Sequence, residues 1–271
     1  MGKEQMDKYI RLADKNLADS IKHQMKSIDN VKMYETENYM IYSIGVPSTD
    51  AHLNGALCLN DDYAEEMLNK AEDFFNDLGL DYTVWVRDHA DFELEKLLKH
   101  KGLSPRRRPG SAVMAIDERI STAALPDGFK VKGVNSRQEV ENFARVTKEA
   151  FDKTQEEIDK MYEEDKSIIA ENMMAFVIYK DDEPVSAVLT MLSDEAAGVY
   201  WVGTVESARG KGLGSYIAQI ATNAGFDSGK NIVILQASEA GERVYTKLGY
   251  QTITRYRTYT IKSREKKIRE L

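Results

Sequence analysis

Hydrophobic residues recur along the chain with two spacings, one typical of helices and the other of strands. Helical spacing covers residues 4–28, 61–79, 91–102, 136–151, 155–172, 213–224 and 239–249. Short apolar or alternating runs, typical of strands, occupy residues 31–35, 39–46, 55–59, 82–86, 111–116, 129–134, 173–180, 185–192, 196–205, 231–236 and 250–261. The pattern predicts a chain in which helices and strands are mixed throughout.

The stretch STAALPDG, residues 121–128, is the strongest candidate for a linker, because it combines small residues with Pro126 and Gly128. It predicts an N-terminal domain at 1–120 and a C-terminal domain at 129–271. The C-terminal elements follow the order β-α-α-β-β-β-α-β-α-β, an α+β pattern with one β-α-β crossover at 199–236, closed by the strand at 250–261. Asp61 or Asp62 is expected to cap the helix at 61–79, and Ser136 with Glu139 is expected to form a capping box.

Charge and composition exclude several classes of function. The net charge is −8 and neither half is basic, so we expect no nucleic-acid partner. No apolar run approaches the roughly 18 residues of a membrane span, and the charged start does not resemble a signal peptide. One cysteine, Cys58 in an apolar run, fits a buried residue of a cytoplasmic protein. The histidines lack metal-ligand spacing, so no metal is expected; they are His23, His52, His89 and His100.

A glycine-rich turn, RGKGLG at residues 209–214, precedes a helical pattern. Its G-x-G-x-G spacing fits neither the dinucleotide fingerprint nor the Walker phosphate loop. A helix N-terminus with glycines lets a diphosphate approach free backbone N–H groups, and Arg209 and Lys211 add positive charge. The alternative is a tight strand-to-helix turn with no ligand.

These residues carry a family resemblance. RGKGLG matches the R/Q-x-x-G-x-G/A signature of the GNAT superfamily of N-acetyltransferases. The preceding VGTVESA resembles that family's fourth strand and bulge, and LQASEAGERVYTKLGY resembles its later motif. The resemblance covers roughly residues 128–262. It implies the GNAT acyl-CoA N-acyltransferase fold, a mixed, mostly antiparallel sheet with a central β-α-β crossover.

The resemblance also implies acetyl-CoA as acyl donor and a set of site residues. The turn from Gly210 to Ser215 would hold the pyrophosphate, and the strand at 202–204 would pair with the pantetheine arm. Ser238 stands where the family often has an asparagine. The implied cofactor-binding residues are Val202, Gly203, Thr204, Arg209, Gly210, Lys211, Gly212, Leu213, Gly214, Ser215 and Ser238.

Tyr245 aligns with the family's proton donor. A tyrosine pKa near 10 exceeds a thiol pKa near 8.5, so Tyr245 is expected to act as a hydrogen-bond donor to the leaving sulfur. The alternative is a helix tyrosine packed between Val244 and Leu248. The general base is not identified from the residues. The carboxylates considered are interpreted as a solvated bulge residue and hairpin-turn acids; they are Glu206, Asp194 and Glu195.

The N-terminal half lacks such a turn, yet residues 82–103 resemble the later part of a similar fold. We expect this half to be a degenerate copy of the GNAT domain that forms one wall of the acceptor site. An unrelated α/β cap is the alternative. The expected function is acetyl transfer to a primary amine of a small molecule or peptide by direct attack on the thioester. A non-catalytic acyl-CoA-binding sensor or scaffold, and an enzyme acting on protein N-termini or lysines, are the alternatives. No membrane partner is expected, and a homodimer is allowed.

Overall fold

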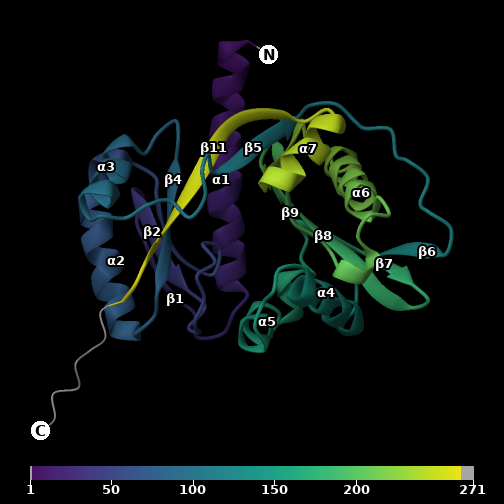
Figure 1. Ribbon diagram of the computed structural model, residues 1–271, viewed down its shortest axis with the longest axis horizontal. Coiled ribbons are helices and arrows are strands. Elements are labelled where there is room, and N and C mark those ends of the chain that lie inside the picture. The colour runs from purple at the N-terminus through teal and green to yellow at the C-terminus, as the bar shows by residue number, and fades with distance from the viewer. Residues whose placement is uncertain (1, 264–271) are drawn as a thin grey trace, which may run out of the picture. The chain divides into compact units, whose positions relative to one another are not determined.

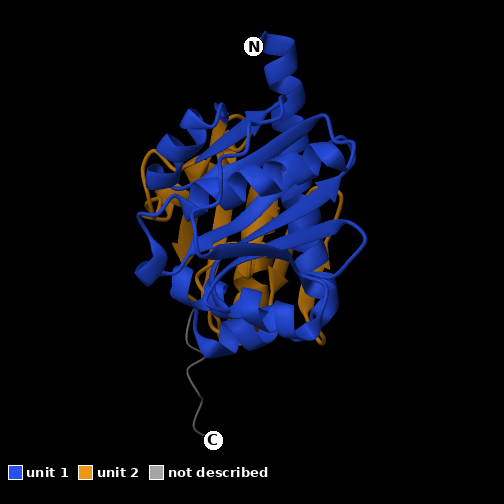
Figure 2. Cartoon of the chain, turned by 90° about the vertical axis from the view of Figure 1, so that its right-hand side faces the viewer, with its two compact units in different colours: residues 1–28, 112–253 blue, residues 29–111, 254–271 orange. Residues whose placement is uncertain are grey.

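The computed structural model describes residues 2–263, and its contacts divide the chain into two compact units (Figure 2). Unit 1 comprises the described parts of residues 1–28 and 112–253, and unit 2 those of residues 29–111 and 254–271. The boundaries between these units do not coincide with the linker predicted at 121–128. The first helix and the strand at 111–116 pack in unit 1, and most of the last strand packs in unit 2.

Unit 1 is a sheet with helices on both faces (Figure 1). Its helices are α1 (Lys3–Lys26), α4 (Arg137–Ala150), α5 (Gln155–Met161), α6 (Leu213–Asp227) and α7 (Glu239–Lys247), with the short turns η2 (Asp165–Ser167) and η3 (Glu206–Ala208). Its strands are β5 (Ser111–Ile116), β6 (Phe129–Gly133), β7 (Met173–Lys180), β8 (Glu183–Ser193), β9 (Ala196–Thr204) and β10 (Ile232–Ala237). Their order is β5-β10-β9-β8-β7-β6, and β9 and β10 are parallel, as expected for a β-α-β crossover.

The side chains of β8 and β9 show which helix covers which face of this sheet. On one face, Thr190 Oγ1 donates to the α6 carbonyl of Ala221, and a Cβ added to Gly225 of α6 would lie 2.8 Å from the Ala197 methyl. On the opposite face, α1 places Asn16 directly against Gly198. Because strand side chains alternate, odd-numbered residues of β9 up to Val199 face α6, and even-numbered residues face α1.

Asn16 fixes α1 on unit 1 through a buried polar cluster. Its Nδ2 donates to Ser193 Oγ at 2.7 Å, and its Oδ1 accepts from the Tyr200 hydroxyl at 2.7 Å. Asn16 is 1% exposed, so water cannot replace these partners. The cluster explains why the N-terminal helix packs with a sheet whose first strand, β5, begins only at Ser111.

We expect Asn16→Ala to lower the free energy of unfolding by about 1–3 kcal/mol, because it leaves the buried Tyr200 hydroxyl without this acceptor. Urea unfolding followed by circular dichroism measures the change. Lys15→Ala is the matched control, because the ion pairs of Lys15 with Asp19 and Asp194 are partly exposed and each should contribute less than about 1 kcal/mol. Equal effects of both substitutions would contradict the assigned role of Asn16.

Unit 2 has the strand order β1-β2-β3-β4-β11. Its elements are β1 (Lys32–Glu35), β2 (Tyr39–Ser43), β3 (Asn54–Cys58), η1 (Asp61–Tyr63), α2 (Ala64–Leu78), β4 (Tyr82–Arg87), α3 (Phe92–His100) and β11 (Gln251–Ile261), which starts in unit 1. Strands β3 and β4 are parallel and joined by α2, and Phe75 of α2 stacks on Tyr82 of β4. Cys58 is fully buried, as predicted, and burial raises the pKa of its thiol to about 12.

The strands that follow α3 and α7 do not pair as the sequence suggests. The strand at 250–261 was expected to close the C-terminal sheet, but β11 pairs antiparallel with β4 over residues 256–261. Strand β5, from the N-terminal half, pairs antiparallel with β10. Strand β5 is almost wholly apolar and β11 alternates, but neither pattern names the neighbouring strand, so long-range pairing makes the choice.

One helix end and two helix caps differ from the expected ones. The helix expected at 155–172 begins with a capping box of Thr154 and Glu157 but ends at Met161, and only a 3-10 turn follows it. Ser136 does not cap α4; its hydroxyl donates to the Glu139 carboxylate. Asn60, rather than Asp61 or Asp62, caps η1. No helix within residues 2–263 is both long and apolar enough to cross a membrane.

Candidate active site

A β-bulge in β9 sets which of its side chains reach the face covered by α6. The register with β8 shifts between Ala187 and Leu189, and Trp201 takes a left-handed φ of 52°. Tyr200 and Trp201 therefore lie on one face, and Val202 and Thr204 return to the α6 face. Gly203 turns the other way, where an added Cβ would lie 2.7 Å from the Ala150 methyl of α4.

The second half of β9 has an open edge. Strand β10 pairs with β9 only over residues 196–199, with Val199 opposite Leu235, although β9 continues to Thr204. The two parallel strands therefore separate after Val199, while β8 still pairs with the other edge of β9 as far as Thr204. An extended ligand can form backbone hydrogen bonds along an edge of this kind.

The glycine turn after β9 has a backbone conformation that lets a ligand approach it closely. Gly210 and Gly212 have φ values of 77° and 79°, and Gly212 is the residue before α6. A Cβ added at either position would meet no heavy atom within 4 Å, so the turn faces open space. Two cations are fixed beside it: Arg209 Nε donates to the Thr204 carbonyl at 3.1 Å, and Lys211 Nζ donates to the Ser207 carbonyl at 3.1 Å.

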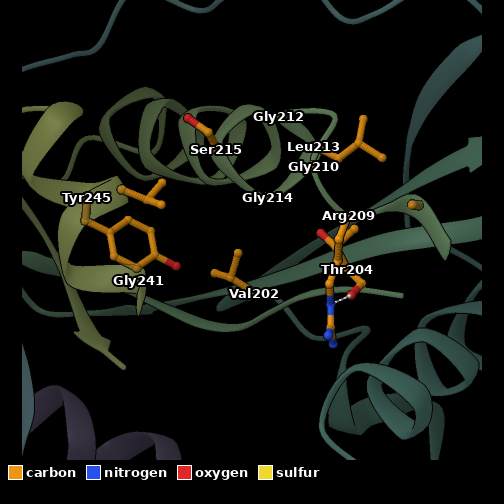
Figure 3. A pocket seen from close by; sticks show the side chains of 12 residues that line it. Val202, Thr204, Arg209, Gly210, Gly212, Leu213, Gly214, Ser215, Gly241 and Tyr245 are labelled. Carbon is orange, nitrogen blue, oxygen red and sulfur yellow. Dashed lines mark hydrogen bonds between the residues drawn. The ribbon is translucent and has the colours of Figure 1, made fainter. Parts of the chain in front are cut away.

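Tyr245 reaches the same region from α7. Figure 3 shows its ring extending from α7 toward Val202 of β9. Gly241 lies one helical turn earlier, and a Cβ there would lie 3.1 Å from the Tyr245 ring. The ring also packs edge-on against Tyr250 at 5.9 Å between centroids. Burial raises the pKa of the Tyr245 hydroxyl to about 12, so it stays protonated at neutral pH.

These elements enclose a cavity of about 310 Å³ (Figure 3). Its lining includes nine of the predicted site residues: Val202, Thr204, Arg209, Gly210, Gly212, Leu213, Gly214, Ser215 and Tyr245. One concave site therefore brings together the glycine turn, the open strand edge and the tyrosine hydroxyl. The arrangement offers backbone N–H groups and positive charge at one end and a neutral hydroxyl donor at the other.

Three predicted residues lie outside the lining of this cavity. Gly203 faces α4, the Lys211 side chain folds back onto the turn, and the Ser238 hydroxyl accepts from the Gly241 N–H to cap α7. The carboxylates considered from the sequence also lie outside it. Glu195 pairs with Lys8 at 2.6 Å and Asp194 with Lys15 at 3.3 Å, and Glu206 is exposed in η3. Within residues 2–263, no three metal-ligating side chains cluster.

Sequence reasoning missed Ala208, Gly241 and Val244, which complete the lining. Ala208 and Val244 carry no chemical signal, because small apolar residues occur everywhere in a core. Gly241 does carry one, since it stands four residues before Tyr245. Residues spaced by four lie on the same helix face, so this spacing gives an aromatic ring room to lie along the helix.

Comparisons with known proteins agree with this geometry. Residues 133–259 match the family model of the acetyltransferase (GNAT) domain. Among solved structures, a GCN5-related N-acetyltransferase from Kribbella flavida is similar with a TM-score of 0.68 and 17% identity, covering 92% of this chain and 95% of its own. A GCN5-related N-acetyltransferase from Sphaerobacter thermophilus has a TM-score of 0.62 and 15% identity, covering 84% and 82%.

A tandem GNAT protein from the clavulanic acid biosynthesis pathway is also similar, with a TM-score of 0.60 and 9% identity, covering 86% of this chain and 84% of its own. No curated protein sequence matches the chain. The family match spans α4 to β11, and therefore includes the bulged strand, the glycine turn and the tyrosine helix. The chain therefore contains an acetyltransferase (GNAT) domain over residues 133–259, and its fold is that of the similar solved structures.

Proposed function

We propose that this protein transfers the acetyl group of acetyl-CoA to a primary amine of a small molecule or peptide. The observation that carries the proposal is the single cavity lined by the glycine turn, the open edge of β9 and the Tyr245 hydroxyl. A diphosphate fits the turn, because Gly210 and Gly212 leave the space above their backbone open beside the N-terminus of α6. Arg209 supplies positive charge at the same end.

The acyl-bearing arm would lie along the open edge of β9, from Thr204 back toward Val202. This direction leads from the glycine turn toward Tyr245, as Figure 3 shows. In the reaction, the amine nitrogen forms a bond to the thioester carbonyl carbon, and the carbon–sulfur bond breaks. The amine proton passes to water or a carboxylate, and the sulfur leaves with negative charge that a hydrogen-bond donor can stabilise.

Tyr245 is the donor that we propose for the leaving sulfur. Its pKa of about 12 lies about 3.5 units above that of a thiol, so complete proton transfer to a thiolate costs about 5 kcal/mol. A hydrogen bond to the developing charge avoids that cost. The amine has its own requirement: with a pKa of about 10.4, roughly one molecule in 2,500 is neutral at pH 7, so the rate should rise with pH until the acceptor is deprotonated.

We further propose that unit 2 contains a degenerate GNAT-like domain that binds no cofactor. Its order β3-α2-β4-α3 repeats the order β9-α6-β10-α7 of unit 1, with a parallel strand pair in each. The turn between β3 and α2 has Asp61 and Asp62 where the other has glycines and cations. Asp61 accepts from the backbone N–H groups of Glu93 and Leu94, at 2.7 and 3.0 Å. Negative charge at this turn disfavours a diphosphate.

The proposed function is tested by measuring thiol release from acetyl-CoA against a panel of primary amines, including small diamines, amino sugars and peptides with free N-termini or lysines. We expect release that depends on the acceptor and a mass gain of one acetyl group on that acceptor. Binding of acetyl-CoA without release for any amine would instead support a non-catalytic sensor or scaffold. A mass-spectrometric screen of cell extract for acetylated species then identifies the natural acceptor.

A further inference from the structure

We infer that Ser186, a buried serine of β8, is a positioning residue. It orients a backbone peptide of β9 so that its N–H can bind the acyl donor. The inference deepens the proposed function and rests on it. Ser186 is 0% exposed and lies opposite Thr204 in the β8–β9 pair. Its Oγ donates to the Gly203 carbonyl at 2.8 Å and lies 2.9 Å from Thr204 Oγ1.

This contact lies directly beside the bulge, where Gly203 is paired with Ala187 of β8. Regular pairing of β8 and β9 is interrupted between Ala187 and Leu189, directly beside Gly203. The serine hydroxyl supplies a donor to the Gly203 carbonyl at this irregular point, and so it fixes the orientation of the peptide between Gly203 and Thr204. A buried carbonyl needs such a partner, and a fully buried hydroxyl is itself held in one orientation by it.

The orientation of this peptide determines what the open edge of β9 presents. In a trans peptide, the carbonyl and the following N–H point in opposite directions. The Gly203 carbonyl points toward Ser186 of β8, so the Thr204 N–H points toward the open edge. A second contact agrees: the Val205 N–H donates to the Val185 carbonyl of β8 at 3.0 Å, so the Thr204 carbonyl also points away from β8, where Arg209 Nε bonds it.

The number of hydroxyl protons then determines whether the Thr204 side chain donates or accepts. A serine hydroxyl has one proton, and that of Ser186 is donated to the Gly203 carbonyl. The hydrogen bond between the two hydroxyls must therefore be donated by Thr204. The Thr204 oxygen, which lies beside Gly214 at the start of α6, has only lone pairs left to offer. Thr204 thus presents an N–H donor from its backbone and an acceptor from its side chain.

This pair complements an amide, which also carries one donor and one acceptor. The pantetheine arm of an acyl-CoA contains two amides, and its nucleotide end contains none. We therefore assign Ser186 to recognition of the arm, while the glycine turn holds the phosphates. Loss of the Ser186 hydroxyl should weaken ligands that contain the arm and leave ligands that contain only the nucleotide end unchanged.

The test compares acetyl-CoA with 3′,5′-ADP, which has the nucleotide end alone, by calorimetry on the full chain. We expect Ser186→Ala to raise the Kd of acetyl-CoA about fivefold to tenfold and to change that of 3′,5′-ADP less than twofold. Ser186→Thr keeps the hydroxyl and should restore most of the affinity. Thr190→Val is the matched control, because it removes another buried hydroxyl from the same face of β8, outside the cavity.

Equal weakening of both ligands by Ser186→Ala, or no weakening of either, would overturn the assignment. If Ser186→Ala does not fold, Thr204→Val decides between the same outcomes, since it removes the side-chain acceptor while keeping the size of the side chain. Failure of the wild-type protein to bind either ligand is a different result, and it would overturn the proposed function itself.

Discussion

Gly212→Glu should weaken acetyl-CoA binding at least 100-fold while leaving the protein folded. Gly212 has a φ of 79° and lines the cavity immediately before the first residue of α6. A side chain there is strained by about 1–2 kcal/mol, but it meets no heavy atom of the protein within 4 Å of its Cβ. The larger effect is electrostatic: a carboxylate roughly 5 Å from a phosphate charge costs about 3 kcal/mol at an effective dielectric constant of about 20.

Gly229→Glu is the control that separates the effect of the carboxylate charge in the cavity from the effect of backbone strain. Gly229 has a φ of 78° and is equally open, but it lies just past the other end of α6 and outside the cavity lining. We expect both variants to lose stability in urea unfolding, Gly229→Glu somewhat more because its carboxylate lies at the negative end of α6, and only Gly212→Glu to lose affinity in calorimetry. Gly212→Lys, which keeps the strain and reverses the charge, should bind more tightly than Gly212→Glu. Unchanged affinity in Gly212→Glu would remove the phosphate site from the turn.

The same turn shows how far local sequence reasoning reaches. Glycines at positions with positive φ, cations next to them and a following helical pattern are all local features, and the structure has each of them between residues 209 and 227. The β-α-β crossover was also predictable, because the apolar run at 231–236 and the helix before it leave few other arrangements. Tyr245 was found through the family motif, and its place in the cavity depends on Gly241, whose spacing had not been used.

Non-local features could not be predicted in the same way. Strand β5 pairs with β10, and β11 with β4, across more than a hundred residues of sequence, and the residue pattern of neither strand identifies its partner. Packing of α1 on unit 1 depends on Asn16 meeting Ser193 and Tyr200, and none of the three residues carries a pattern by itself. The role of Ser186 has the same origin, since it depends on the contacts of Ser186 with Gly203 and Thr204 of the neighbouring strand.

Tyr245→Phe should lower kcat about 100- to 1,000-fold and change KM for acetyl-CoA little. Removing one hydrogen-bond donor to developing negative charge in a water-poor site typically has an effect of this size. The ring itself stays packed against Tyr250 and over Gly241, so folding should be unaffected. Because burial raises the pKa of Tyr245 to about 12, the hydroxyl keeps its proton at lower pH, and the wild-type rate should show no loss from tyrosine ionisation below about pH 11.

Tyr250→Phe is the matched control for this prediction, because it removes a neighbouring buried hydroxyl that lies outside the cavity lining. The Tyr250 hydroxyl lies 2.7 Å from Thr222 Oγ1, which also donates to the Ala218 carbonyl. Its loss should cost about 0.5–1.5 kcal/mol of stability and leave kcat within about twofold. Steady-state thiol release at saturating acceptor, measured for both variants, distinguishes the two hydroxyls. A Tyr245→Phe enzyme with wild-type kcat would mean that water, rather than the tyrosine, stabilises the leaving sulfur.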